Sequence, residues 1–81
     1  EFEQSLKNGD SYVTQGSFEL ALICYLRCKT LNPQSPEAKV GIARCYAAQK
    51  KDEPAQIEII EALQHAPGFV PARFLWGEIL M

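Results

Sequence analysis

Residues 9–33, GDSYVTQGSFELALICYLRCKTLNP, carry a pattern that the chain repeats. Five of its positions recur in phase 34 residues further on. The recurring pairs are Gly9 and Ala43, Tyr12 and Tyr46, Ala21 and Ala55, Cys28 and Ala62, and Pro33 and Pro67. A fixed period of this size is typical of proteins built from stacked units, each of which buries its apolar face only against its neighbours. Gly77 and Leu80 continue the period into a third, partial copy.

The repeat resembles the tetratricopeptide repeat, whose pattern is W-x2-L-G-x2-Y, then A-x3-F, then P. The first copy has Asn8-Gly9-x2-Tyr12, Ala21-x3-Tyr25 and Pro33, and the second has Ile42-Ala43-x2-Tyr46, Ala55-x3-Ile59 and Pro67. The third begins as Trp76-Gly77-x2-Leu80. The chain departs from the pattern at the leading tryptophan, where it has Ser5, Lys39 and Arg73, and at Asn8, where leucine is usual. The resemblance covers essentially the whole chain. It implies an all-α fold of stacked antiparallel helix hairpins, a segment of an α-solenoid.

We expect a single domain, 1–81, with repeat 1 at about 2–35, repeat 2 at about 36–69 and a partial repeat 3 at about 70–81. Apolar residues at helical spacing, together with start and stop signals, predict five helices. The first two are expected over 2–15 and 18–31, and the fifth over 71–81. The third follows a Ser35 cap and ends before Lys50, and the fourth follows an Asp52 cap and ends at Ala66. Gly16 is expected to end the first helix in a left-handed conformation, and Ser17 to cap the second.

The same register predicts the core. We expect buried side chains at Tyr12, Ala21, Tyr25 and Cys28 in the first helix pair, and at Tyr46, Ala55, Ile59 and Ala62 in the second. The apolar stripe of the second helix also includes Phe18, Leu22 and Leu31.

Composition restricts the partners that can be expected. The chain is 47% hydrophobic and 22% charged with a net charge of −2, which is too balanced to favour nucleic acid or an anionic membrane surface. No apolar run approaches the roughly 18 residues of a membrane span, and no signal peptide is evident. Three cysteines suit reduced thiols, so an intracellular site, cytoplasmic or nuclear, is expected. Because the chain begins at Glu1 without methionine, it is expected to be a piece of a longer protein.

Candidate chemistry is sparse. Cys24 and Cys28 are one helical turn apart, and Cys45 and His65 are the other soft ligands, but zinc needs about four ligands and Cys28 occupies the small-residue slot of Ala62. No carboxylate and nucleophile accompany His65 in a pattern typical of general-base catalysis. The sequence also has no phosphate-binding loop or hydrolase motif. We expect no enzyme activity, no cofactor and no metal site.

The resemblance places the candidate site in a groove, because in this family the first helix of each repeat lines the concave surface. Helical spacing predicts nine residues there, with a central row of acid, base and acid among mostly apolar neighbours. They are Leu6, Asp10, Val13, Val40, Arg44, Ala47, Phe74, Leu75 and Glu78. A contiguous exposed apolar patch is typical of a binding site. The expected function is a non-catalytic scaffold that binds a peptide or helix of a protein partner. The alternative is a purely structural internal segment of a longer solenoid, whose groove and ends are covered by its own chain.

Two further expectations concern partners. Some relatives bind the acidic C-terminus of chaperones through a clamp of lysine, asparagine and arginine in this groove. The corresponding slots here hold Leu6, Asp10, Gly41, Pro71 and Leu75, none of which is a cation or an amide donor, so a clamp is not expected. The last helix lacks a following helix to cover Trp76, Ile79 and Leu80, so association through its exposed face is expected.

Overall fold

The computed structural model describes residues 1–80, and of residues 78–80 only the backbone. Within this range the chain forms five helices and no strand. They are α1 (Phe2–Gln15), α2 (Phe18–Leu31), α3 (Pro36–Ala48), α4 (Asp52–His65) and α5 (Val70–Leu80). The prediction of an all-α fold is confirmed, and the predicted bounds of the helices are met to within a residue or two.

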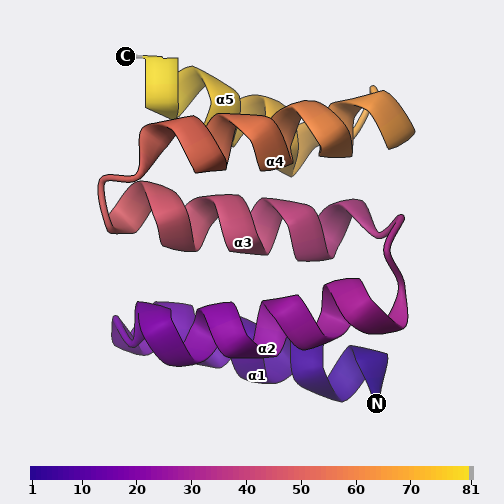
Figure 1. The fold of residues 1–81 in the computed structure, drawn as a ribbon, viewed down its shortest axis with the longest axis vertical. Coiled ribbons are helices and arrows are strands. Elements are labelled where there is room, and N and C mark those ends of the chain that lie inside the picture. The colour runs from indigo at the N-terminus through magenta and orange to yellow at the C-terminus, as the bar shows by residue number, and fades with distance from the viewer. Residues whose placement is uncertain (81) are drawn as a thin grey trace.

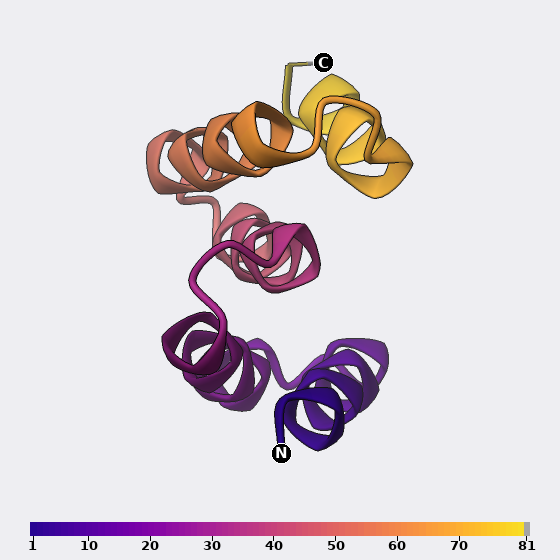
Figure 2. The same cartoon turned by 90° about the vertical axis from the view of Figure 1, so that its right-hand side faces the viewer.

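The helices lie antiparallel to their neighbours along the chain, with α1 and α2 at one end of the molecule, α3 in the middle, and α4 and α5 at the other end (Figure 1). In the view turned by 90°, α2 and α4 lie on one side and α1 and α5 on the other, with α3 between them (Figure 2). Helix α3 contacts all four other helices. The helices α1, α3 and α5 therefore line one side of the molecule, and α2 and α4 line the opposite side.

The turns between helices follow local signals in the sequence. Gly16 ends α1 with φ 81°, as predicted, and the Ser17 N–H donates to the Tyr12 carbonyl at 2.8 Å. Ser35 caps α3, because its side-chain oxygen accepts from the Ala38 N–H at 3.4 Å. Ser17 occupies the cap position of α2 without a side-chain bond.

The prediction that Asp52 caps α4 is wrong. Lys51 takes the cap position and Asp52 is the first residue of α4, followed by Glu53. Two carboxylates in the first turn still favour the helix, because they face the positive end of its dipole. Asp52 therefore still stabilises the start of α4 electrostatically, although it is the first residue of the helix and not its cap.

Two groups of buried residues form the core, and α3 contributes to both. The first contains Ala21 and Tyr25 of α2 with Ile42 and Cys45 of α3. The second joins α3, α4 and α5 through Val40, Ala43, Ala55, Ile59, Ala62, Ala72 and Leu75. Six of the predicted core positions are confirmed as buried: Ala21, Tyr25, Cys28, Ala55, Ile59 and Ala62.

Five predicted core positions are wrong. Four of them are only half-buried, namely Tyr12, Phe18, Leu22 and Tyr46, and Leu31 is 47% exposed. A tyrosine ring is commonly placed with its hydroxyl end in water, which suits the two tyrosines. Leu31 is the last residue of α2, so the chain turns away before another helix can cover it.

One lysine is buried in the interior. Lys39 is 4% exposed, and its Nζ lies 3.5 Å from Oε1 of Glu61 on α4. A second ion pair joins Lys29 of α2 to Glu58 of α4 at 3.1 Å. Both pairs connect α4 to an earlier helix. In the described part of the chain, no helix is long and apolar enough to cross a bilayer.

Candidate functional site

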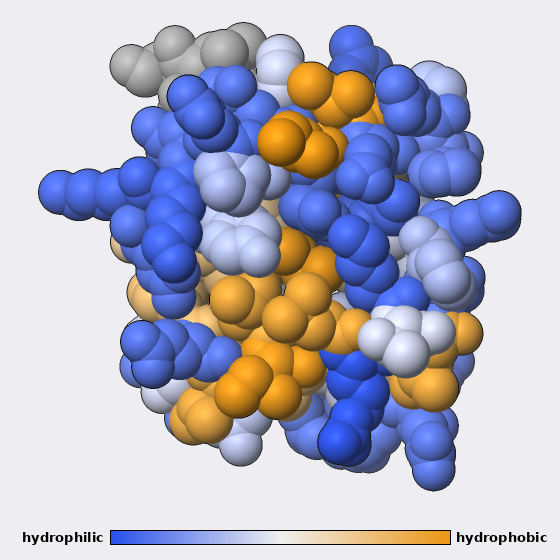
Figure 3. Space-filling view, viewed as in Figure 1, coloured by the Kyte–Doolittle hydropathy of each residue, from blue (hydrophilic) through white to orange (hydrophobic). Residues whose placement is uncertain are grey.

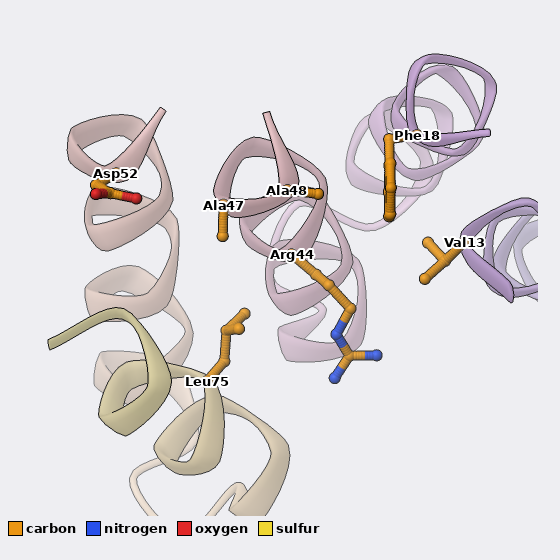
Figure 4. Close-up of a pocket in the computed structure, with 7 residues that line it drawn as sticks. All are labelled: Val13, Phe18, Arg44, Ala47, Ala48, Asp52 and Leu75. Atoms are coloured by element: carbon orange, nitrogen blue, oxygen red, sulfur yellow. The ribbon is translucent and has the colours of Figure 1, made fainter. Parts of the chain in front are cut away.

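Two adjoining hollows lie on the side lined by α1, α3 and α5, and together we call them the groove. The larger, of about 570 Å³, is lined by Val13, Phe18, Arg44, Ala47, Ala48, Asp52 and Leu75 (Figure 4). The smaller, of about 210 Å³, is lined by Leu6, Asp10, Tyr25, Glu37, Val40, Gly41, Arg44, Phe69 and Pro71. Arg44 of α3 lines both hollows, and so stands at the centre of the groove.

The side chain of Arg44 extends from α3 into the space between Val13 of α1 and Leu75 of α5 (Figure 4). Arg44 is exposed, whereas Val13 and Ala47 are half-buried. A guanidinium that pairs with no carboxylate among the described side chains is thus presented between apolar walls. This arrangement can hold a carboxylate or a backbone carbonyl of a bound segment while methyl groups contact its side chains.

Seven of the nine predicted site residues line the groove: Leu6, Asp10, Val13, Val40, Arg44, Ala47 and Leu75. Phe74 does not. It is 71% exposed and lines a separate hollow with Val70 and Arg73. One residue along a helix is a rotation of about 100°, so turning Leu75 toward α3 turns Phe74 away. The side chain of Glu78 lies outside the described residues, as do the predicted exposed side chains of Ile79 and Leu80.

The groove is less apolar than predicted. Val40 and Leu75 were expected at its surface, but each is only 4% exposed and belongs to the second core group. They are buried because α5 packs directly on α3, and Val40 and Leu75 lie at that contact. The accessible part of the groove therefore combines the charges of Asp10 and Arg44 with the half-buried side chains of Leu6, Val13 and Ala47.

Asp10 does not pair with Arg44, contrary to the expected row of acid, base and acid. Its carboxylate instead accepts a hydrogen bond from the Tyr25 hydroxyl. Among the described side chains, the ion pairs are Lys29–Glu58 and Lys39–Glu61. Burial, reinforced by the Asp10 carboxylate, raises the pKa of Tyr25 above its ordinary value, so the phenol remains a donor at neutral pH. Asp10 is thus held at the edge of the groove by Tyr25 of α2.

Two glycines that flank the Tyr25 ring account for its position. A Cβ atom on Gly9 of α1 would lie 2.8 Å from Tyr25 Cε1, and one on Gly41 of α3 would lie 2.5 Å from the same atom. Gly41 was placed among the groove slots from the sequence, and its contact with Tyr25 was missed. The available signal was the cost of a glycine in a helix, about 1 kcal/mol relative to alanine, which needs a packing reason.

Two of the three thiols are placed unfavourably for reaction. Cys28 and Cys45 are buried and Cys24 is half-buried. Burial raises the pKa of Cys45 to about 11, opposed in part by Arg44, and burial also raises the pKa of Cys28. Both thiols are therefore neutral, and poor nucleophiles, at neutral pH. Among the described residues, no three His, Cys, Asp or Glu side chains are placed to share a metal ion.

A second surface was missed by the sequence reasoning. The side of α2 and α4 carries an apolar area (Figure 3). Leu20, Ile23 and Leu26 of α2 are exposed, and so are Ile57 and Ile60 of α4. We call the first three the α2 outer face. The signal was present in the sequence, since α2 has large apolar residues outside its predicted core stripe.

Comparison of the sequence with models of known protein families gives no match, and comparison with curated proteins gives none. The resemblance to the tetratricopeptide repeat therefore depends on the 34-residue period and its matching residues. Function is best approached from the groove and from the charge at its centre.

Proposed function

We propose that this chain is a tetratricopeptide-like, non-catalytic protein-interaction scaffold that binds a peptide or helix of a partner protein in the groove. The observation that carries the proposal is the position of Arg44, which is exposed and lines two adjoining hollows between α1, α3 and α5. Ligand sites are typically concave and mostly apolar, with few polar groups that fix orientation. The groove has this composition.

The lining of the groove favours one kind of ligand. Arg44 favours an acidic side chain or a C-terminal carboxylate, because a charge-assisted bond to a guanidinium is about twice as strong as a neutral one. The half-buried Leu6, Val13 and Ala47 favour apolar residues on either side of that carboxylate. The partner segment is then a short peptide or one turn or more of an amphipathic helix, with an acidic residue between two apolar ones.

The exposed side chains of α5 favour a second candidate, a purely structural segment. Val70 is 55% exposed and Phe74 is 71% exposed on the described part of this helix. Large apolar groups at this level of exposure are commonly covered in an assembly. In a structural segment of a longer solenoid, other parts of the same protein would cover both α5 and the groove, and no free peptide would bind.

Selection of peptides from a random displayed library on the purified chain, followed by calorimetry of the selected peptides, tests the proposal. Arg44→Glu and Val13→Asp should each weaken binding by about tenfold or more. Arg73→Glu is the matched control, since Arg73 is exposed on α5 and lines neither hollow of the groove, and it should change binding by less than about twofold. Circular dichroism checks that each variant keeps its helicity. If no selected peptide depends on Arg44 or Val13, the groove is not the binding surface and the structural candidate is favoured.

A further inference from the structure

Helix α2 has apolar side chains around its whole circumference. Ala21, Tyr25 and Cys28 are buried against α1 and α3, yet the opposite side of the helix is also apolar. On this α2 outer face, Leu20 is 49% exposed, Ile23 is 62% exposed and Leu26 is 42% exposed. Figure 3, viewed as Figure 1, shows an apolar area in the lower half of the molecule, where α2 lies. A helix that is apolar on all sides is normally buried on all sides.

The residues of this face are arranged symmetrically about Ile23. Leu20 and Leu26 lie three residues before and after it, and Glu19 and Arg27 lie four residues before and after it. With 3.6 residues per turn, positions three and four away from Ile23 share its face of the helix. Glu19 and Arg27 are both exposed, and neither takes part in the two ion pairs among the described side chains.

We propose that a second copy of this chain covers the α2 outer face, with two α2 helices packed antiparallel about a two-fold axis beside Ile23. In this arrangement Glu19 of each copy lies next to Arg27 of the other, and the contact is made twice. The row that joins Glu19, Ile23 and Arg27 is an i±4 ridge. Two such ridges pack together at a crossing angle of about 50°, which is the commonest class in globular proteins.

The charge pattern favours a second copy over an unrelated partner. A two-fold interface uses the same patch on both subunits, so charged residues of the patch pair across it when opposite charges lie at equal distances from the axis. Glu19 and Arg27 meet that condition, whereas a parallel arrangement would place Glu19 next to Glu19. An interface centred on one helix is small, below about 1,200 Å² in total, and such interfaces are typically weak and reversible. The inference does not depend on the proposed peptide binding, because the groove lies on the side of α1, α3 and α5.

Sedimentation equilibrium of the 81-residue chain over a concentration series up to about 1 mM measures this association. Ile23→Ser should raise the dissociation constant of the dimer by about tenfold or more, because it removes the central apolar contact. Ile57→Ser is the matched control, since Ile57 is 58% exposed on α4, outside the α2 outer face. Phe74→Ser tests the exposed face of α5. Both controls should change the constant by less than about threefold.

A charge exchange tests the antiparallel geometry itself. Glu19→Arg alone and Arg27→Glu alone should each weaken the dimer, because each places like charges together twice. An equimolar mixture of the two variants should associate more tightly than either variant alone, since in the mixed dimer both contacts pair opposite charges. A chain with both substitutions should also recover the affinity. Because Glu19→Arg changes the first turn of α2, circular dichroism of every variant is compared with that of the parent chain.

Three outcomes would overturn the inference. The first is a parent chain that stays monomeric across the whole concentration series. The second is a dimer that survives Ile23→Ser but is lost in Phe74→Ser. The third is a mixture of the two charge variants that associates no more tightly than the separate variants.

Discussion

At the scale of single residues, Tyr25 links the core to the groove. Its ring lies between Gly9 of α1 and Gly41 of α3, and its hydroxyl holds the Asp10 carboxylate at the groove edge. Each glycine costs about 1 kcal/mol of helix propensity, and the close packing of a fully buried aromatic ring offsets that cost. The same ring that joins α2 to its neighbours therefore also determines which charges a groove ligand meets.

Gly41→Ala tests this packing. A Cβ atom 2.5 Å from Tyr25 Cε1 forces the ring or the helix to move. Overpacking typically costs about 1–3 kcal/mol, against a gain in helix propensity of about 1 kcal/mol. We expect a net decrease of about 1–2 kcal/mol in the free energy of unfolding, measured by urea unfolding followed by circular dichroism. Gly77→Ala in α5 is the control, because a Cβ atom there meets no described atom within 4 Å, and it should leave stability unchanged or raise it. Equal effects of the two substitutions would contradict the tight packing.

At the scale of elements, the two helix pairs use the same turn. Gly16 follows α1 with φ 81°, and Lys50, which is 34 residues later, has φ 63° after α3. The next N–H donates back to a tyrosine carbonyl in each case, from Ser17 to Tyr12 and from Lys51 to Tyr46, both at 2.8 Å. A left-handed conformation costs an L-residue other than glycine about 1–2 kcal/mol. The second repeat thus has the same left-handed turn at Lys50, although lysine does not favour that backbone conformation.

Replacement of Lys50 by glycine should relieve this strain. We expect Lys50→Gly to raise the free energy of unfolding by about 0.5–1 kcal/mol, since the loss of a cation near the end of α3 takes back part of the gain. The reverse change, Gly16→Lys, should lower it by about 1 kcal/mol or more. Thermal and urea unfolding of both variants measure the two effects. A loss of stability in Lys50→Gly would show that the lysine side chain, and not the backbone, stabilises the turn.

The bounds of the helices could be predicted from the sequence better than which faces of the helices are buried. Start and stop residues such as Gly16 and Ser35 are local signals, so helix bounds follow from the chain itself. Whether Val40 and Leu75 are at the surface depends on how closely α5 packs on α3, which no local signal determines. The exposure of Phe74 follows from the same rotation of α5. Periodicity likewise predicted the buried stripe of α2 through Ala21 and Tyr25, but an apolar residue on the outer side, such as Ile23, does not fit a single stripe.

At the scale of the whole molecule, α3 is the element on which the others depend. Seven of its residues are buried, and it contributes Ile42 and Cys45 to one core group and Val40 and Ala43 to the other. The two groups thus share one helix. Loss of α3 would expose both groups at once, so the two ends of the molecule should not unfold independently, although stacked repeats can unfold in parts when the contacts between units are weak.

Ile42→Ala tests whether the two core groups unfold together. Ile42 is 1% exposed in the first group, and its truncation should cost about 2–5 kcal/mol. Trp76 packs against the second group, at the other end of the molecule, and its fluorescence reports on that group. If α3 couples the groups, the urea midpoint of Trp76 fluorescence in Ile42→Ala should fall together with the midpoint from circular dichroism, as in a two-state transition. Ile59→Ala, a matched truncation of a fully buried isoleucine in the second group, should shift both midpoints in the same way. A Trp76 midpoint that stays at its original value in Ile42→Ala, while the helical signal is lost earlier, would show that each group unfolds separately and that α3 does not couple them.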